Sequence, residues 1–187
     1  MADHYTAGVD YQIISDYPPS HVPEGKIEVI AFFWYGDPHG KVFEAELDSW
    51  SQQQPTTVLL ERVPVAFNRN FVSQQKLYYA LAALGEENRL HRKVSEAIQV
   101  EGNSLFTPEA QAAWVAAQGV DRDNFLSALN SSESAMKVQR AAQQANRYGI
   151  QSVPSVVVQG QYRTSLATTQ SIEGTINVLD FLVAKAN

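Results

Sequence analysis

Cysteine is absent from this sequence of 187 residues. The absence excludes disulfide bonds, catalysis by a thiolate and metal sites with cysteine ligands. It does not indicate a compartment, because a protein without thiols is indifferent to the surrounding redox potential. A run of about 18 apolar residues, which a membrane-spanning helix needs, is also missing, so no membrane span is expected. The N-terminal residues show no signal-peptide pattern.

Basic residues are the scarcer charges, with 14 Lys and Arg against 20 Asp and Glu, for a net charge of −6. Nothing in this balance supplies a surface that neutralises phosphates, so a nucleic-acid partner is not expected. The one basic cluster, residues 89–93, follows Glu86 and Glu87 and is interpreted as a solvated helix face. The length suits one well-filled core that carries an insertion, rather than two independent domains.

The first third of the chain predicts a β-α-β unit. Residues 3–26 form a polar lead-in with one apolar patch at 11–14, which could be an edge strand. Residues 27–35 are almost continuously apolar, as in a strand buried on both faces of a parallel or mixed sheet. A helix with apolar residues at spacings of three and four follows, and a second strand is predicted at 57–65. The predicted apolar stripe of this helix comprises Val42, Phe43, Leu47 and Trp50.

About 75 residues of helical pattern come next. Thr107-Pro108-Glu109 has the cap, first-turn proline and early acid of a helix start, and Asp123 precedes another helix. A long helix from Ser131–Glu133 to Gly149 carries the last stripe of the block, which comprises Val138, Ala141, Ala142, Ala145 and Tyr148. Strands at 155–159 and 162–164 and a helix at 171–185 complete the chain. This order predicts an α/β domain with a helical insertion.

The segment FFWYGDPHGKVFE, residues 32–44, contains a strand-to-helix junction. Asp37 and Pro38 are typical of a helix start, so Asp37 is either a helix cap or a functional group. Gly40 is unusual, because glycine in a first turn costs up to about 1 kcal/mol relative to alanine. His39 is either an exposed polar residue, a general acid-base group or a metal ligand.

A second informative segment is YGIQSVPSVVVQGQY, residues 148–162. Pro154 precedes an apolar strand, where a proline merely lacks a hydrogen-bond donor. Alternatively, the Val153–Pro154 bond is cis. The sequence alone leaves both interpretations open.

These two segments and the order of elements resemble the DsbA family of periplasmic thiol-disulfide oxidoreductases, which are thioredoxin folds with a helical insertion. The resemblance extends from about Glu28 to Asn187. The family's active site reads C-P-H-C after an aromatic run, with a phenylalanine and a glutamate soon after, as in Phe43-Glu44 here. Pro38 and His39 are retained, whereas Asp37 and Gly40 occupy the two cysteine positions.

Other positions also compare with the family pattern. Ala31 stands where the family tends to keep a buried acid beneath the active site, and Arg62 where it often has a lysine. Val153-Pro154 matches the family's cis-proline dipeptide. The resemblance implies a thioredoxin-like fold with a mixed central sheet and an inserted all-helical domain. The expected domains are a discontinuous thioredoxin-like domain, residues 1–66 and 134–187, and a helical insertion, residues 67–133.

The first functional hypothesis is a binding module that has lost thiol chemistry. Asp37, Pro38, His39 and Gly40 are then vestigial active-site positions with no catalytic residue among them. The expected groove, which would bind unfolded or extended segments of peptides and proteins, comprises Trp34, Tyr35, His39, Val153 and Pro154. No cofactor or metal is expected. The resemblance implies a periplasmic location and a precursor with a signal peptide.

Two alternatives belong to other classes. One is an enzyme that binds glutathione or another small molecule, in which Asp37 and His39 polarise a thiol or carbonyl and Tyr35 supplies the nearest hydroxyl. The other is an accessory subunit or scaffold with the helical block as its interface. Alanine-rich stripes at 110–117 and 135–145 are more simply explained by close helix packing. The family's usual label, thiol:disulfide interchange protein, would not describe the chemistry of this chain.

Overall fold

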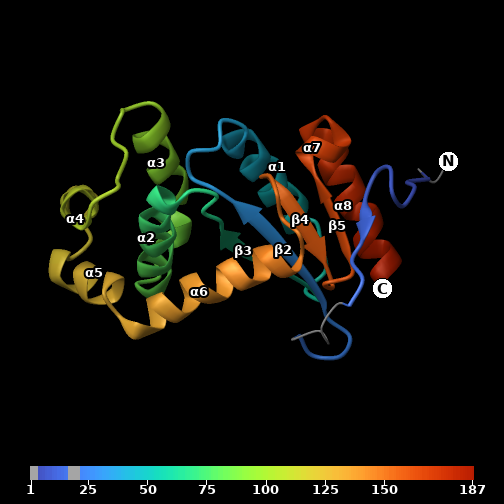
Figure 1. The fold of residues 1–187 in the computed structure, drawn as a ribbon, viewed down its shortest axis with the longest axis horizontal. Coiled ribbons are helices and arrows are strands. Elements are labelled where there is room, and N and C mark those ends of the chain that lie inside the picture. The colour runs from blue at the N-terminus through green and yellow to red at the C-terminus, as the bar shows by residue number, and fades with distance from the viewer. Residues whose placement is uncertain (1–3, 17–21) are drawn as a thin grey trace. The chain divides into compact units, whose positions relative to one another are not determined.

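The computed structural model describes residues 4–16 and 22–187 (Figure 1). Residue 3 and residues 17–21 of the predicted lead-in lie outside this part of the chain. The strands are β1 (Gln12–Ile13), β2 (Ile27–Phe33), β3 (Val58–Pro64), β4 (Ser155–Val158) and β5 (Tyr162–Ser165). The helices are α1 (Gly40–Gln52), α2 (Val72–Ala83), α3 (Glu87–Gln99), α4 (Pro108–Ala117), α5 (Arg122–Leu129), α6 (Ser132–Arg147), α7 (Leu166–Thr169) and α8 (Ile172–Ala186), with a 3-10 turn, η1 (Arg69–Phe71).

The five strands form one sheet in the order β1-β5-β4-β2-β3. β4 pairs antiparallel with both β2 and β5, with Val29 opposite Val158 in the first pairing. β2 and β3 are neighbours joined through α1, the crossover connection that parallel strands need. The sheet is therefore mixed, and the predicted edge strand at residues 11–14 is present as β1.

The run of apolar residues in β2 gives a strand in which every residue is buried, as predicted. Alternate side chains of a strand point to opposite faces. Val29 and Ala31 join a core with Phe43 and Leu47 of α1 and with Leu179 of α8. On the other face, the ring of Phe32 packs against Tyr148 with centroids 6.3 Å apart. Both faces of the sheet are thus covered at this strand.

The start of α1 corrects two predictions. The helix begins at Gly40 with His39 as its N-cap, so Asp37 is not the helix cap and Pro38 is not its first residue. The first helical hydrogen bond at this end runs from the amide of Phe43 to the carbonyl of His39, whereas the amide of Asp37 closes a turn on Trp34. Gly40 therefore lies in the first turn of the helix, not in the loop before it.

Val42 does not belong to the buried stripe of α1, because its side chain is 56% exposed. The buried residues of this helix are Phe43, Leu47 and Trp50, at spacings of four and three. One residue of a helix turns by about 100°, which carries Val42 away from the sheet. Ala142 of α6 is likewise exposed although it was predicted in a stripe.

The described chain divides into two compact units. The first comprises the described residues up to Phe33, with His39–Val63 and Ala145–Asn187, and it contains the sheet, α1, α7 and α8. The second comprises Trp34–Pro38 and Pro64–Gln144, and it contains α2 to α5 and most of α6.

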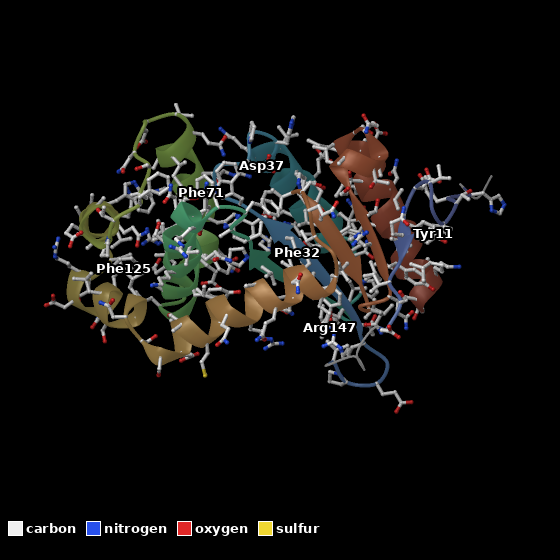
Figure 2. All side chains as sticks on the ribbon, viewed as in Figure 1. Tyr11, Phe32, Asp37, Phe71, Phe125 and Arg147 are labelled. Carbon is white, nitrogen blue, oxygen red and sulfur yellow. The ribbon has the colours of Figure 1, made fainter. Side chains whose placement is uncertain are left out.

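Each unit has its own apolar core. The second unit buries completely Leu77, Leu81, Leu90, Val94 and Phe125, and Figure 2 shows Phe125 on α5. Thr107 caps α4 through the amide of Ala110, with Pro108 as the first helical residue, as predicted. The cap of α5 is Asp121, whose carboxylate accepts the amide of Asn124, and Asp123 lies in the first turn of the helix.

The sequence analysis missed η1 and α7. Both are short, and a four-residue helix such as α7 has too few residues to show a hydrophobic period. Ser165 caps α7, and Gln170 ends it in the left-handed region at φ 66°. Among the described residues, no helix combines the length and the apolar character that crossing a membrane requires.

Candidate functional site

The junction between β2 and α1 is a tight turn with little free space. The amide of Asp37 donates to the carbonyl of Trp34 at 3.1 Å. Gly36 lies under the indole of Trp34, where a Cβ at residue 36 would be 2.3 Å from Trp34 Cζ2. Real Cβ contacts are longer than this, so a side chain at residue 36 would displace the indole. The glycine in this turn is therefore explained by close packing.

Gln99, the last residue of α3, holds the same turn from the other side. Its Nε2 donates to the carbonyl oxygens of Tyr35 at 2.7 Å and of Asp37 at 3.0 Å. These two carbonyls precede α1 and have no place in its hydrogen-bond ladder. Sequence analysis did not single out Gln99, because nothing in the sequence relates it to a segment more than 60 residues away.

Trp34 is fixed in its orientation and is only partly buried. Its Nε1 donates to Oε1 of Gln74 at 2.9 Å, and Nε2 of Gln74 donates to the carbonyl of Ser104 at 2.9 Å. The indole packs on Phe71 with centroids 4.6 Å apart, and Phe71 packs on Phe106, which is 40% exposed. Part of this aromatic cluster is thus open to solvent.

Tyr35 does not contribute an exposed surface, contrary to its predicted place in the groove. It is 2% exposed, and its ring lies 5.3 Å from that of His91 and 6.4 Å from that of Tyr78. His91 was assigned to a solvated face, but it is the half-buried member of the basic cluster and packs on these tyrosines. The last two residues of that cluster, Arg92 and Lys93, are exposed as predicted.

The four positions from Asp37 to Gly40, predicted to be vestigial, differ in their exposure. Asp37 is 5% exposed, whereas Pro38 and His39 are exposed and Gly40 is half-buried. A carboxylate at residue 37 has no sulfur with which to form a mixed disulfide, which is the intermediate of thiol-disulfide exchange. In this loop the imidazole of His39 is exposed, the carboxyl group of Asp37 is buried, and no thiol is present.

The Val153–Pro154 peptide bond is cis, in agreement with the expectation from the resemblance. Val153 is half-buried and Pro154 is buried. The carbonyl of Pro154 accepts the amide of Leu166 at 3.2 Å, and the hydroxyl of Ser155 donates to the carbonyl of Ser152 at 2.6 Å. The loop is thus tied to both neighbouring segments of its own unit.

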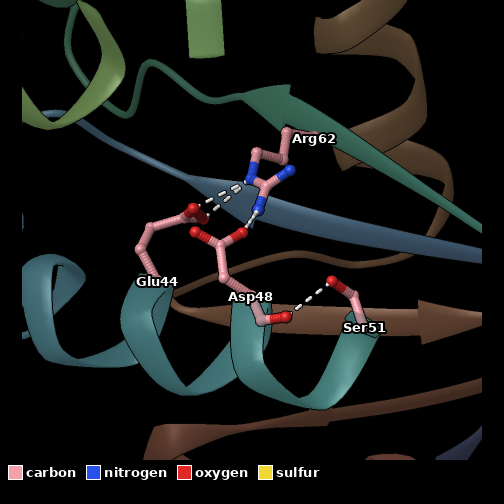
Figure 3. A network of polar contacts seen from close by, with 4 residues as sticks. All are labelled: Glu44, Asp48, Ser51 and Arg62. Carbon is pink, nitrogen blue, oxygen red and sulfur yellow. Dashed lines mark hydrogen bonds and ion pairs between the residues drawn. The ribbon is translucent and has the colours of Figure 1, made fainter. Parts of the chain in front are cut away.

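Arg62 of β3 pairs with two carboxylates of α1 (Figure 3). Its Nε contacts Glu44 Oε2 at 2.8 Å, and its Nη2 contacts Asp48 Oδ1 at 2.5 Å. The resemblance would place a buried acid at residue 31. An alanine stands there instead, and it is 1% exposed. The positive charge of Arg62 is balanced by residues of α1 instead.

Comparison with known proteins agrees with this arrangement. The model of the DSBA-like thioredoxin domain matches residues 24–178. A thiol:disulfide interchange protein DsbA of Burkholderia cepacia is 44% identical over 177 residues, which cover 95% of this chain and 84% of that protein.

Solved structures give the same result. The crystal structure of Pseudomonas aeruginosa DsbA superposes with a TM-score of 0.92 at 36% identity, over 97% of this chain and 94% of that one. The oxidoreductase DsbA from Xylella fastidiosa superposes with a TM-score of 0.89 at 30% identity, over 97% of each chain. With its mixed sheet, its helical unit and its cysteine-free junction, the chain belongs to the family of DsbA-like thioredoxin domains and is a member without cysteine.

Proposed function

We propose that this protein has lost thiol-disulfide exchange and acts as a periplasmic binding module for unfolded or extended segments of other proteins. The observation that carries the proposal is the junction itself. Asp37 and Gly40 replace both cysteines of the family pattern, yet the turn before them remains closely packed and hydrogen-bonded. Loss of the chemistry with retention of the framework favours a role that depends on binding.

Several features support a peptide as the ligand. Trp34, Phe71 and Phe106 form an aromatic cluster with part of its area exposed. Aromatic side chains combine a large apolar area with few rotatable bonds, which suits recognition of varied segments. The groove of Trp34, His39, Val153 and Pro154 is proposed on the family resemblance, without the ring of Tyr35. The periplasmic location and the signal peptide of the precursor are proposed on the same ground.

The loss of chemistry is tested by assays of thiol exchange. The purified chain should neither reduce insulin nor speed the oxidative refolding of reduced ribonuclease above the uncatalysed rate, because no mixed disulfide can form. Turnover by a preparation free of contaminating oxidoreductases would refute the proposal.

The binding role is tested by capture of a reduced, alkylated ribonuclease, an unfolded chain without reactive thiols. Trp34→Ala should weaken its affinity about tenfold or more, as for a central aromatic contact. Trp114→Ala is the matched control, because Trp114 is also half-buried but lies on α4. Equal affinities of the two variants and the parent would argue against this surface.

The alternative of a glutathione-binding enzyme receives no support from the site. Its nearest hydroxyl belongs to Tyr35, whose side chain is buried. Calorimetric titration of the protein with glutathione would distinguish the two hypotheses, since the peptide-binding proposal expects no heat of binding.

A further inference from the structure

We infer that Gln99 is the positioning residue of the junction and that it holds the proposed binding loop in one conformation. The inference deepens the proposed function, and its importance for binding rests on that proposal. Its structural part stands on the hydrogen bonds of residues 34–37 alone.

The first step of the argument concerns donors and acceptors. A neutral amide nitrogen carries two hydrogens, and Gln99 Nε2 directs them at two carbonyls, those of Tyr35 and Asp37. These carbonyls lie on either side of Gly36. One side chain therefore bridges the most conformationally free residue of the turn.

The second step concerns the other restraints on this turn. Pro38 has no amide hydrogen, so the segment from Asp37 to the start of α1 has one backbone donor fewer. The amide of Asp37 closes the turn on Trp34, and the indole of Trp34 covers Gly36. The two bonds of Gln99 add to these restraints from a helix outside the turn.

The third step concerns the origin of Gln99. Gln99 ends α3 and extends from the helix end to the turn, and Ala97, two residues before it, is completely buried. Asn103 also bonds this helix end, through its amide to the carbonyl of Ala97. The helix thus presents the carboxamide from a packed element, which is the arrangement that preorganises a loop.

The test uses the full chain and measures amide hydrogen exchange of Asp37 by NMR. Gln99→Glu keeps the shape of the side chain but replaces two donors with acceptors, so exchange of this amide should become about tenfold faster or more, from the loss of two hydrogen bonds. Gln99→Leu removes the donors without adding a charge and should act in the same direction. Gln139→Glu, on the exposed face of α6, is the matched control for charge and should leave this amide unchanged.

Amide exchange of the Gln99→Glu variant at several pH values distinguishes the effect of the lost hydrogen-bond donors from the effect of side-chain shape. At a pH below about 4.3, the carboxyl of the Gln99→Glu variant becomes protonated and regains one donor. Protection of the Asp37 amide, relative to the parent at the same pH, should then recover in part. Global melting of the variants should remain close to that of the control, since the bonds restrain a turn and not a core.

Two results would overturn the inference: unchanged exchange in both Gln99 variants, or equal loss of protection in Gln139→Glu. If the inference holds, affinity for the alkylated ribonuclease should fall about tenfold in Gln99→Glu, because a disordered loop must be ordered on binding. The Gln99 variants could show faster exchange while the parent protein fails to bind the ribonuclease. That pair of results would refute the proposed function and leave the positioning role of Gln99 intact.

Discussion

At the residue scale, Asp37 and Gly40 stand where the family pattern has its two cysteines. Both positions lie beside residues that the family pattern retains, Pro38 and His39. The carboxyl group of Asp37 lies just before the N-terminus of α1, where the helix dipole favours an anion. A thiolate at residue 37 would be favoured by the same dipole, although the present site contains no sulfur.

This effect of the dipole predicts that thiol chemistry can be restored. In the double variant Asp37→Cys/Gly40→Cys, the thiol at residue 37 lies near a helix N-terminus and beside His39 in the sequence. Its pKa should therefore be lowered from about 8.5 into the range of roughly 3.5–7.5. A stabilised thiolate favours the reduced form, so the disulfide should be oxidising. The double variant should oxidise a model dithiol peptide, more slowly than the family because Ala31 supplies no acid.

Each single variant controls for this experiment, since one thiol cannot complete the exchange. The thiol pKa is measured from the absorbance of the thiolate during a pH titration. An unperturbed thiol together with no oxidation of the peptide would show that the junction retains the fold of the family but not its electrostatics.

Arg62 offers a second residue-scale prediction. Its side chain is 18% exposed and that of Glu44 15%, so their pair lies between the exposed pairs, worth about 0–1 kcal/mol, and the buried pairs, whose disruption costs about 3–5 kcal/mol. Arg62→Met should therefore lower the free energy of unfolding by about 1–3 kcal/mol, because it leaves two carboxylates close together.

The exposed pair of Lys137 and Glu133 on α6 is the control, with side chains 42% and 67% exposed. Lys137→Met should change the free energy of unfolding by no more than about 0.5 kcal/mol. Denaturation in urea at pH 7 measures both variants. Similar losses for the two would mean that partial burial does not strengthen the Arg62 pair.

At the scale of elements, α1 shows how packing selects among apolar residues that a pattern cannot rank. Val42 and Leu47 are both apolar residues of the predicted stripe, yet Leu47 is completely buried and Val42 is 56% exposed. The difference arises from the face that α1 turns toward the sheet core with α8.

This difference predicts unequal effects of the same change. Leu47→Ala should lower the free energy of unfolding by about 2–5 kcal/mol, because it removes buried methyl groups and leaves a cavity. Val42→Ala should change it by about 0.5 kcal/mol or less. Urea denaturation measures both. If Val42→Ala proved the more costly, the helix would have to be rotated relative to the sheet.

At the scale of the whole molecule, the turn at residues 34–37 belongs to the helical unit, although it joins two elements of the sheet unit. Gln74 and Gln99 supply the side chains that hold it. The domain division proposed from the sequence, 1–66 with 134–187 and the insertion 67–133, places both glutamines in the insertion and the turn outside it.

This arrangement predicts the effect of removing the insertion. A chain in which residues 67–133 are replaced by a short Gly-Ser linker should keep slow amide exchange in β2 and β4, whose core residues lie in the sheet unit. The amide of Asp37 should lose its protection, because Gln99 is gone. A chain that is unfolded throughout would show that the proposed division does not correspond to independently folding domains.

The sequence by itself determined the order of the main elements, the buried character of β2 and the absence of cysteine. These features depend on composition and on short-range periodicity, which a single chain displays directly. The sequence also predicted the cap at Thr107 and the family resemblance, because the residues that indicate each of them are close together in the sequence.

Only the tertiary structure decided the start of α1, the burial of Tyr35 and the role of Gln99. Each depends on groups that are distant in the sequence: Tyr35 is enclosed by Tyr78 and His91, and the turn is held by a carboxamide from the end of α3. Hydrogen-bond satisfaction of the turn carbonyls is a property of the folded chain, because their donor is brought to them only when the helices pack.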